Sequence, residues 1–416
     1  MFAAHLAQIR RREPLLESLD NYAMQSYNVL MWILRYVEAH LRRSAQTRPV
    51  LVLTGARQTG KTSTLRRLFP DYSFISLDLP TEAEQAEKEP EAFLQRHPAP
   101  AIIDEVQYAP ALFRHLKVAV EGKRNRHGQY LLTGSQKFTL MKGVSESLAG
   151  RADVVELETL SLAEILAAAP GTSLETAIVR GGFPELQANP EIDAVAFYNS
   201  YLATYLERDV RSLANVGSLR DFERFLRACA LRSANLLNKA DLARDIGIAP
   251  STANQWLSML EASGQVALLE PWFSNRTKSL VKSPKLYLAD TGLLCALLNI
   301  RSEEALADSP WAGAVWETFV FAQLRHRERR AGRAGSLFFW RDRAREVDFV
   351  VDAAGHLELF EAKWTELPAQ SDSVNLAFVR DVVGKSRVST SAIICRAPNS
   401  YPISNGFRAV PVAELT

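Results

Sequence analysis

Cysteine is scarce in this chain: Cys229, Cys295 and Cys395 are the only three among 416 residues, and they stand far apart in apolar surroundings. They form neither a disulfide framework nor a zinc-binding spacing, which suits a reducing cytosol. Long apolar runs are also missing, since none approaches the roughly 20 residues that span a bilayer. The N-terminus lacks the pattern of a signal peptide, because Arg10–Arg12 is followed by acidic and polar residues. We therefore expect a cytoplasmic protein without a membrane segment.

Net charge is small as well, at +2, and says little about partners. Hydrophobic residues make up 47% of the chain, which is enough for real cores and excludes a disordered chain. The length favours about two to four domains. Charge is concentrated locally, because residues 321–345 hold eight arginines and only two acidic residues. This run is either a phosphate-binding surface or a solvated helix face.

The stretch after residue 49 predicts a phosphate-binding loop. An apolar run, 50–53, leads into the pattern G-x-x-x-x-G-K-[ST] from Gly55 to Thr62, and a helix-like segment follows. Gly55 and Gly60 let backbone N–H groups close around a phosphate, at which the following helix points its positive end. Lys61 is then expected to reach the β/γ-phosphates, and the Thr62 hydroxyl to ligate Mg²⁺. The expected nucleotide-contacting residues are Gly55, Ala56, Arg57, Gln58, Thr59, Gly60, Lys61, Thr62 and Ser63.

A second motif follows at residues 98–105. Here an apolar strand delivers two adjacent carboxylates, Asp104 and Glu105, at its C-terminal end. Ligands bind at this end of the strands in parallel sheets. We expect Asp104 to contact the nucleotide-bound Mg²⁺ and Glu105 to polarise the attacking water. Two carboxylates at a buried strand end are costly unless a metal or donors face them, which disfavours a merely solvated strand end.

Two further stretches supply candidate catalytic groups. The apolar strand 129–133 ends in small polar side chains, and either Thr133 or Ser135 is expected to hydrogen-bond the γ-phosphate or the attacking water. A plain turn explains this stretch nearly as well. Arg151 stands just before another strand, where it is either a surface arginine or a finger that enters a neighbouring subunit's site and stabilises the transferring charge.

Strand and helix alternate through the first third of the chain. This alternation, with short connections, predicts a parallel sheet that is covered on both faces. An amphipathic helix over 15–43 is expected to pack beside it. The predicted strands are 50–54, 73–78, 100–104, 129–133 and 153–157, and the predicted helices are 61–69, 90–96, 110–121 and 161–168.

The middle of the chain has the pattern of a helix-turn-helix. Residues 161–235 are predicted to be mostly helical, with a break at the turn 180–184. A short helix, 240–246, is followed by a turn at Gly247 and by a second helix that begins at Pro250.

A wing is predicted next to these helices. It consists of a hairpin of 266–269 and 285–288, with residues 275–278 near its tip. The candidate recognition helix carries no lysine or arginine, although phosphate contacts usually dominate affinity for DNA. Duplex binding and a structural or protein-contact role therefore both stay open. The polar side chains on this helix are Ser251, Thr252, Asn254 and Gln255.

The C-terminal third carries a second set of acidic residues. A predicted hairpin over 346–363 places Asp348 on one strand and Glu361 and Lys363 on the next. In this arrangement two carboxylates share a divalent metal while a lysine positions or activates water. Glu317, on a preceding helix, would add a ligand. Such spacing is common in surface salt bridges, but the apolar residues between the charged positions favour a nuclease-type fold.

Several motifs stand out together: 53–62, 103–107, 132–136, 147–151, 181–184, 205–209, 284–292, 316–317 and the set Asp348, Glu361 and Lys363. Jointly they resemble a family of bacterial and archaeal AAA-type ATPases, in which an AAA-like nucleotide domain precedes a winged helix and a C-terminal domain of unknown function. The resemblance covers nearly the whole chain from about residue 30. It implies binding of ATP and Mg²⁺, ring assembly, and a C-terminal domain similar to PD-(D/E)xK nucleases. Thr318 departs from the pattern, because the family usually has Asn there.

The expected fold class is α/β: a P-loop NTPase with a parallel sheet, then a helical and winged-helix domain, then an α/β restriction-endonuclease-like domain. We expect an Mg²⁺-dependent ATPase that assembles as a homo-oligomeric ring, a hexamer or a heptamer, and acts on DNA or another nucleic acid. Two alternatives stay open: a nucleotide-switched regulatory module with slow hydrolysis, and an ATP-gated, metal-dependent nuclease. The expected parts are an N-terminal helical segment (1–48), the ATPase core (49–160), a helical lid or linker (161–235), the winged helix-turn-helix (236–295) and the nuclease-like domain (296–416).

Overall fold

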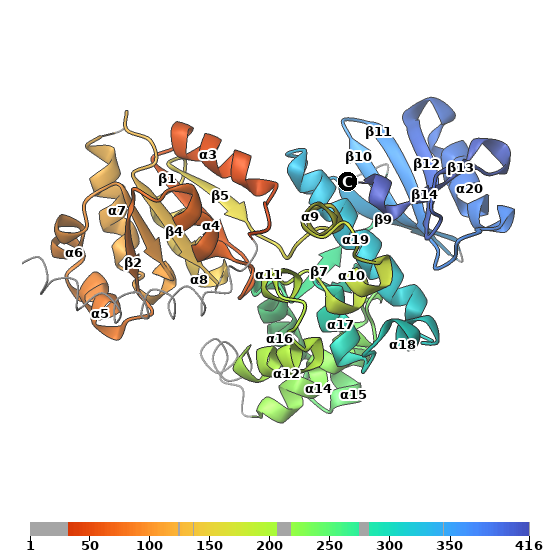
Figure 1. The fold of residues 1–416 in the computed structure, drawn as a ribbon, viewed down its shortest axis with the longest axis horizontal. Coiled ribbons are helices and arrows are strands. Elements are labelled where there is room, and N and C mark those ends of the chain that lie inside the picture. The colour runs from red at the N-terminus through yellow and green to blue at the C-terminus, as the bar shows by residue number, and fades with distance from the viewer. Residues whose placement is uncertain are drawn as a thin grey trace, which may run out of the picture.

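The computed structural model describes residues 32–415, apart from 124, 136, 206–217, 274–282 and 344. Three sheets form within this described part, of five, three and six strands. Figure 1 shows the N-terminal part, in orange and yellow, and the C-terminal part, in blue, on either side, with the green and teal middle part below and between them. The predicted wing tip, 275–278, lies outside the described residues.

The N-terminal sheet is fully parallel and has the strand order β2-β3-β4-β1-β5. Strand β1, between β4 and β5, is buried along its whole length. All five predicted strands are confirmed, each with ends within two residues of the prediction. Their bounds are β1 Val50–Thr54, β2 Ser73–Ser76, β3 Ala101–Asp104, β4 Tyr130–Gly134 and β5 Ala152–Glu156.

Side chains of β1 alternate between the two faces of this sheet, as the two-residue repeat of a strand requires. Val50 and Val52 pack with α5 to α8, and Leu51 and Leu53 pack with α3 and α4 on the other face. The helix expected over 15–43 is only partly confirmed, because residues 32–36 are not helical. The helices are α3 Val37–Thr47, α4 Lys61–Leu68, α5 Pro80–Lys88, α6 Pro90–Arg96, α7 Leu112–Glu121 and α8 Lys137–Ser147.

The middle part combines helices with a small antiparallel sheet of order β6-β8-β7. The two predicted helices and the hairpin strands 266–269 and 285–288 are confirmed. The motifs 181–184 and 284–292 meet here. The Asp290 carboxylate accepts hydrogen bonds from the Gly182 N–H (2.8 Å) and from the Tyr198 hydroxyl (2.9 Å). The elements are α9 Leu162–Ala168, α10 Leu174–Arg180, α11 Pro184–Ala188, α12 Ala194–Tyr205, α14 Leu219–Ala230, β6 Asn235–Leu236, α15 Lys239–Ile246, α16 Pro250–Ala262, β7 Val266–Leu269, β8 Lys285–Leu288, α17 Thr291–Leu297 and α18 Glu303–Ala307.

The C-terminal part is a mixed sheet of order β13-β14-β12-β11-β10-β9. Strands β10 and β11 form the predicted antiparallel hairpin, and Phe349 pairs with Phe360, so Asp348 and Glu361 are neighbours across the two strands. The elements are α19 Ala312–Arg330, β9 Leu337–Asp342, β10 Arg345–Ala353, β11 His356–Ala362, α20 Val374–Val383, β12 Val388–Cys395, β13 Tyr401–Pro402 and β14 Arg408–Pro411.

The middle and C-terminal parts share one hydrophobic core. One cluster of buried side chains contains Ile33 and continues from Leu160 to Leu415, while the two faces of the N-terminal sheet and the other face of the C-terminal sheet have further clusters. Tyr287 on β8 stacks on Phe321 of α19, with ring centroids 4.2 Å apart. The expected boundary at residue 295/296 stays a prediction.

Candidate functional site

The P-loop lies where β1 meets α4, and its two glycines are required by the backbone. Gly55 has φ +146°, and a Cβ there would lie 2.1 Å from the Leu157 carbonyl oxygen. Gly60 has φ +89° and precedes the first residue of α4, Lys61. Both values lie in the region that side chains with a Cβ rarely adopt. The loop therefore has the open backbone cradle that a phosphate needs.

Lys61 is buried and lies over this loop. Its ammonium donates to the carbonyl oxygens of Gly55 (3.0 Å) and Ala56 (2.8 Å). The reach of this amine to the β/γ-phosphates stays a prediction.

Thr62 and Asp104 meet at the C-terminal edge of the sheet. The Thr62 hydroxyl donates to Asp104 Oδ1 over 2.6 Å, although 42 positions separate the two residues. The Thr133 hydroxyl, at the end of β4, donates to the same carboxylate oxygen. A hydroxyl and a carboxylate beside a phosphate cradle are the oxygen donors that Mg²⁺ takes in nucleotide sites. The residues present thus fit a nucleotide-bound divalent cation.

Glu105 is held in an unusual backbone conformation next to this pair. Its φ of +56° is left-handed, and its N–H donates to the Thr133 hydroxyl over 3.1 Å. Its carboxylate accepts hydrogen bonds from Ser135 (3.3 Å) and from the buried amide of Gln107. Both residues predicted as alternatives, Thr133 and Ser135, therefore contact the acidic pair. Gln107 lies within the motif 103–107, but its sequence pattern did not reveal this contact.

Arg151 lies at the other edge of the sheet from the P-loop. It precedes β5, where Ala152 pairs with Val50 at the start of β1. Its guanidinium pairs with Glu121 and donates to the Ala149 carbonyl (3.1 Å). Within its own chain Arg151 is therefore not part of the nucleotide site, and a role in a neighbouring subunit stays a prediction.

Arg35 is a site residue that the sequence analysis did not identify. It is 7% exposed, and its guanidinium donates to the carbonyl of Thr59 in the P-loop (3.0 Å). It also donates to the Glu158 carbonyl (2.7 Å) and to the Glu164 carboxylate (3.2 Å). The pKa of Glu164 is lowered, because Arg35, His326 and backbone donors outweigh the effect of burial. Arg35 thus fastens the P-loop to the segment after β5.

The middle part also reaches the P-loop. Gly264, just after α16, lies so near that a Cβ there would be 3.6 Å from the backbone nitrogen of Ala56. A Cβ on Gly60 would be 4.0 Å from the ring of Pro184, the first residue of α11. The P-loop therefore lies close to the start of α11 and to the turn after α16.

An ion-pair network joins the end of β5 to α19. Arg325 pairs with Glu158 (2.6 Å), and Arg329 pairs with Glu156 (2.9 Å). Burial would raise the pKa of Glu158, but the charges of Arg325, His326 and Arg329 lower it. Burial lowers the pKa of His326, although Glu158 opposes this shift.

Much of the arginine-rich run is engaged in ion pairs within the chain, and the two interpretations from sequence stay predictions. Several of its arginines are engaged within the chain, since Arg333 pairs with Glu328 (2.7 Å) and Arg341 with Glu346 (3.0 Å) in addition to the contacts with β5.

The C-terminal acidic residues come together as predicted, but with an unpredicted cation among them. Lys285 on β8 pairs with Glu317 (2.8 Å), Glu346 (2.5 Å) and Asp348 (3.4 Å). We call these three carboxylates and Glu361 the C-terminal acidic cluster. Burial alone would lower the pKa of Lys285, but the surrounding carboxylates raise it above its ordinary value.

The pKa values of two glutamates in this cluster are raised, because burial disfavours their negatively charged form. Burial and the charge of Asp348 raise the pKa of Glu361, although Lys363 pairs with its Oε1 at 3.0 Å. Its buried Oε2 has no hydrogen-bond partner. Burial and Asp348 also raise the pKa of Glu317, against the lowering by Lys285.

The expected divalent metal does not fit this cluster. Asp348 Oδ1 faces Lys285, and Oδ2 accepts the Ala362 N–H (2.9 Å). Glu317 Oε1 accepts from both Lys285 and the Tyr287 hydroxyl (2.7 Å). Within the described ranges, no three His, Cys, Asp or Glu side chains are grouped to hold a metal ion.

Thr318 has a structural contact instead of a place in that cluster. Its buried hydroxyl donates to the Ala314 carbonyl (2.7 Å) and bonds Ser233 (2.9 Å). The departure from the family's usual Asn is thus compatible with a well-satisfied side chain.

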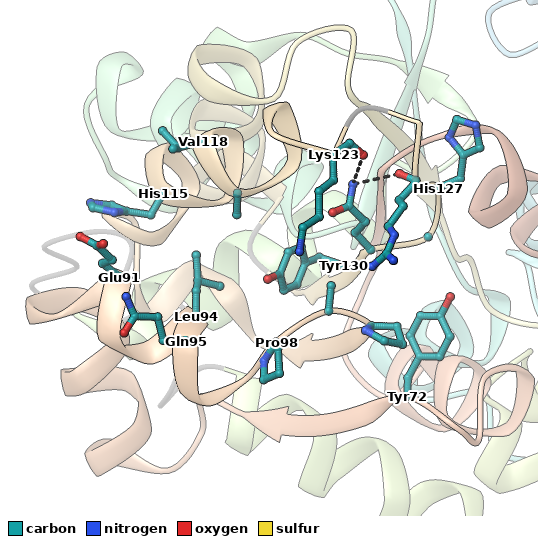
Figure 2. Close-up of a pocket in the computed structure, with 16 residues that line it drawn as sticks. Tyr72, Glu91, Leu94, Gln95, Pro98, His115, Val118, Lys123, His127 and Tyr130 are labelled. Carbon is teal, nitrogen blue, oxygen red and sulfur yellow. Dashed lines mark hydrogen bonds between the residues drawn. The ribbon is translucent and has the colours of Figure 1, made fainter.

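A large cavity lies away from the P-loop, at the N-terminal ends of β3 and β4. Its volume is about 850 Å³, and its lining includes Tyr130 with Lys123 and His127 from the preceding loop. Figure 2 shows these side chains around the cavity and the bonds that the Gln129 amide donates to the carbonyls of Lys123 (3.1 Å) and Arg126 (2.9 Å). This cavity is separate from the nucleotide site.

No helix among the described residues has the length and apolar character to cross a membrane.

Three domain families match successive parts of the chain. An AAA domain family matches residues 47–166, a domain of unknown function (DUF8612) matches 171–304, and another (DUF4143) matches 312–415. Two relatives are the uncharacterized proteins Rv2008c of Mycobacterium tuberculosis and Mb2031c of Mycobacterium bovis. Each is 34% identical over 388 residues, which cover 92% of this chain and 84% of the relative.

Solved structures of ATPases show a more distant likeness. The Walker-type ATPase paby2304 of Pyrococcus abyssi has 17% identity and a TM-score of 0.45, over 64% of this chain and 96% of that one. The Holliday junction branch migration motor RuvB of Thermotoga maritima has 17% identity and a TM-score of 0.28, over 56% and 85%. P-loop ATPase homology implies nucleotide binding with a divalent metal. The chain belongs to the family of the two mycobacterial proteins, and its N-terminal domain is an AAA-type P-loop ATPase domain.

Proposed function

We propose that this protein binds ATP with Mg²⁺ and hydrolyses it. The observation that carries the proposal is the 2.6 Å contact between the Thr62 hydroxyl and the Asp104 carboxylate. This contact joins the first turn of α4, which follows the phosphate-binding loop, to Asp104 at the end of β3. Few arrangements other than a nucleotide–metal site require these two motifs side by side.

The cradle binds and orients the triphosphate. Backbone N–H groups of residues 55–63 enclose the phosphates, and the Lys61 ammonium leaves its carbonyl partners for the β/γ-phosphate oxygens. Thr62 and Asp104 would hold Mg²⁺ from the protein side. The bound cation neutralises charge on the phosphate oxygens.

Glu105 orients and activates the attacking water in this proposal. Its carboxylate is kept in place by the donors of Ser135 and Gln107, and its backbone by Thr133. The same hydroxyl of Thr133 contacts Asp104, so the metal side and the water side of the site share one hydrogen-bonded group.

Loss of Lys61 tests the site. Lys61→Ala is expected to abolish ATP binding, measured by titration of a fluorescent ATP analogue with Mg²⁺. Lys123→Ala, at the cavity on the other edge of the sheet, is the matched control and should bind normally. Equal affinity of both variants would contradict the proposal.

We further propose a homo-oligomeric ring in which Arg151 acts in trans. The support is the family resemblance and the distance of Arg151 from its own P-loop along the strands. A mixing experiment tests it: Lys61→Ala supplies the arginine, and Arg151→Ala supplies the intact P-loop. Activity that is restored on mixing supports the trans finger, and activity equal to the sum of the separate variants contradicts it. Native mass with and without an ATP analogue reports the ring.

For residues 236–295 we propose a winged helix-turn-helix that contacts nucleic acid. Support comes from the succession of α14, α15 and α16 with the β7–β8 hairpin, and from exposed polar residues on α16. Binding of labelled duplex DNA at two salt concentrations, with Asn254→Ala and Gln255→Ala, tests this role. Binding that is the same in these variants and the wild type would point to a protein-contact role instead.

A nucleotide-switched regulatory module is the second candidate function. The contacts of Gly264 and Pro184 with the P-loop favour it, because they link the loop to the middle part. Slow single-turnover hydrolysis together with an ATP-dependent change of oligomer mass would support the switch over a continuously working ATPase.

For residues 296–416 we propose a restriction-endonuclease-like sheet. Nicking of supercoiled plasmid with Mg²⁺ or Mn²⁺ tests the nuclease alternative, with Asp348→Ala and Lys363→Ala as controls.

A further inference from the structure

Lys285 is the most completely surrounded charge in the C-terminal half of the described chain. It is 1% exposed, and its ammonium contacts carboxylates from two different elements, Glu317 on α19 and Glu346 and Asp348 on β10. An ammonium has three N–H donors and no acceptor. The number of donors therefore equals the number of carboxylates that face it.

Lys285 comes from another sheet than the carboxylates. It lies on β8 in the three-stranded sheet, and Tyr287, two residues on and on the same face of the strand, donates to Glu317 over 2.7 Å. The ring of Phe339, on β9, lies 5.7 Å from the ammonium. The cation thus enters the C-terminal acidic cluster as part of a packed interface, not as a flexible surface side chain.

Lys285 contacts two of the residues at which the sequence predicts a divalent metal, Glu317 and Asp348, whereas Glu361 pairs with Lys363. Oxygen ligands bind Mg²⁺ or Ca²⁺ at roughly 2.0–2.6 Å from a common centre. Here the carboxylates instead make ion pairs of 2.5 to 3.4 Å to one nitrogen. Asp348 already accepts from Lys285 at Oδ1 and from the Ala362 N–H at Oδ2, so a metal there would compete with Lys285 for the same carboxylate. Buried carboxylates are costly unless a cation faces them or they take up a proton, and Lys285 supplies a cation to three members of this cluster.

We propose that the Lys285 ammonium is the permanent cation of the C-terminal acidic cluster, and that it fastens β8 to α19 and β10 where a divalent metal is otherwise expected. The middle and C-terminal parts are then held together through this ion-pair cluster. The proposal does not depend on ATP hydrolysis.

Binding of Mn²⁺ without nucleotide tests whether the C-terminal acidic cluster binds a divalent metal. Electron paramagnetic resonance titration of the full chain should give the same Mn²⁺ binding for the wild type and Asp348→Asn, because the P-loop residues are unchanged in both. A site that is present in the wild type and lost in Asp348→Asn would overturn the proposal. This comparison leaves Lys285 in place, so it stands even if lysine variants fold poorly.

Thermal unfolding tests whether Lys285 stabilises the packing of β8 against α19 and β10. Lys285→Met keeps the length of the side chain and removes its charge, and it should lower the unfolding temperature by about 5–15 °C. Lys363→Met is the matched control, because Lys363 pairs with one carboxylate of the same cluster at 3.0 Å but is 36% exposed at its side chain. Its effect should be about 3 °C or less. Lys285→Arg, which keeps the charge, should recover part of the loss. Equal unfolding temperatures for Lys285→Met and the wild type would overturn the proposal.

Discussion

Replacement of Glu105 by Gln separates ATP binding from ATP hydrolysis. The amide keeps the size of the side chain and can still accept a hydrogen bond from Ser135, which lies 3.3 Å from the carboxylate. What is lost is the negative charge that draws a proton from water. The left-handed backbone of Glu105 is unaffected, because its N–H still bonds the Thr133 hydroxyl. The substitution therefore changes the chemistry of the site with little change in its shape.

The size of the effect follows from these contacts. A positioned general base contributes roughly 10²- to 10⁴-fold to a rate, which corresponds to about 3–5 kcal/mol of activation free energy. The exchange of one hydrogen bond to a charged acceptor for one to a neutral acceptor costs about 1 kcal/mol of stability. ATP affinity should stay nearly constant, because Lys61, Thr62 and Asp104 make the phosphate and metal contacts in the proposed site. The barrier to hydrolysis should thus rise several times more than the stability falls.

Single-turnover hydrolysis with protein in excess of ATP measures this barrier, and titration of a fluorescent analogue measures binding in parallel. Glu91→Gln is the matched control, since this exposed carboxylate lines the cavity at the other edge of the sheet. We expect Glu105→Gln to bind ATP normally and to hydrolyse it at least 100-fold more slowly, which is the lower limit for loss of a general base. Turnover that matches the control variant would refute the assignment of Glu105.

Three more predictions follow from the geometry. Gly55→Ala places a Cβ 2.1 Å from a backbone oxygen and should abolish ATP binding and lower the midpoint of thermal unfolding, whereas Gly122→Ala, with nothing within 4 Å, should change neither. Burial lowers the pKa of His326, so the unfolded chain takes up its proton first and stability falls as the pH drops below about 6.5. Urea titrations between pH 7 and 5 should show the wild type losing stability relative to His326→Gln. The raised pKa values of Glu317 and Glu361 act in the opposite direction but equally in both proteins, and the lowered pKa of Glu158 acts below that range; parallel pH profiles would contradict the prediction. Arg35→Lys should weaken ATP binding about 10-fold or more, measured by titration, because an ammonium cannot reproduce the fork of bonds to the P-loop carbonyl and its neighbours; unchanged affinity would show that these bonds do not hold the loop.

The helix α5 of the N-terminal domain escaped prediction for a physical reason. The helix α5 buries only Ala86, so its sequence has no apolar repeat to reveal it. The opposite holds for α7, where Leu112, Phe113, Leu116 and Val120 are buried at helical spacing, and this helix was predicted within two residues of its start.

The nucleotide site shows what local sequence can specify. Apolar strands that end in Thr54, Asp104 and Gly134 must lie side by side in a parallel sheet, and their C-terminal ends then share one edge. Strand order alone brings the P-loop to the acidic pair, so the motif residues could be assigned before any coordinates.

Contacts between domains could not be assigned in this way. The partner of Glu317 and Asp348 is Lys285, and the partner of the Thr59 carbonyl is Arg35, in each case a residue outside the motif that it completes. Which cation reaches a buried carboxylate depends on how whole sheets and helices pack, and a lysine or a metal satisfies the same charge.

The sequence by itself thus determined the AAA-type nucleotide domain, because its motifs are tied to successive strand ends through short-range geometry. Only the tertiary structure decided that the C-terminal acidic residues face an ammonium, because that outcome depends on the docking of β8 onto α19, a contact between distant segments that no local pattern encodes.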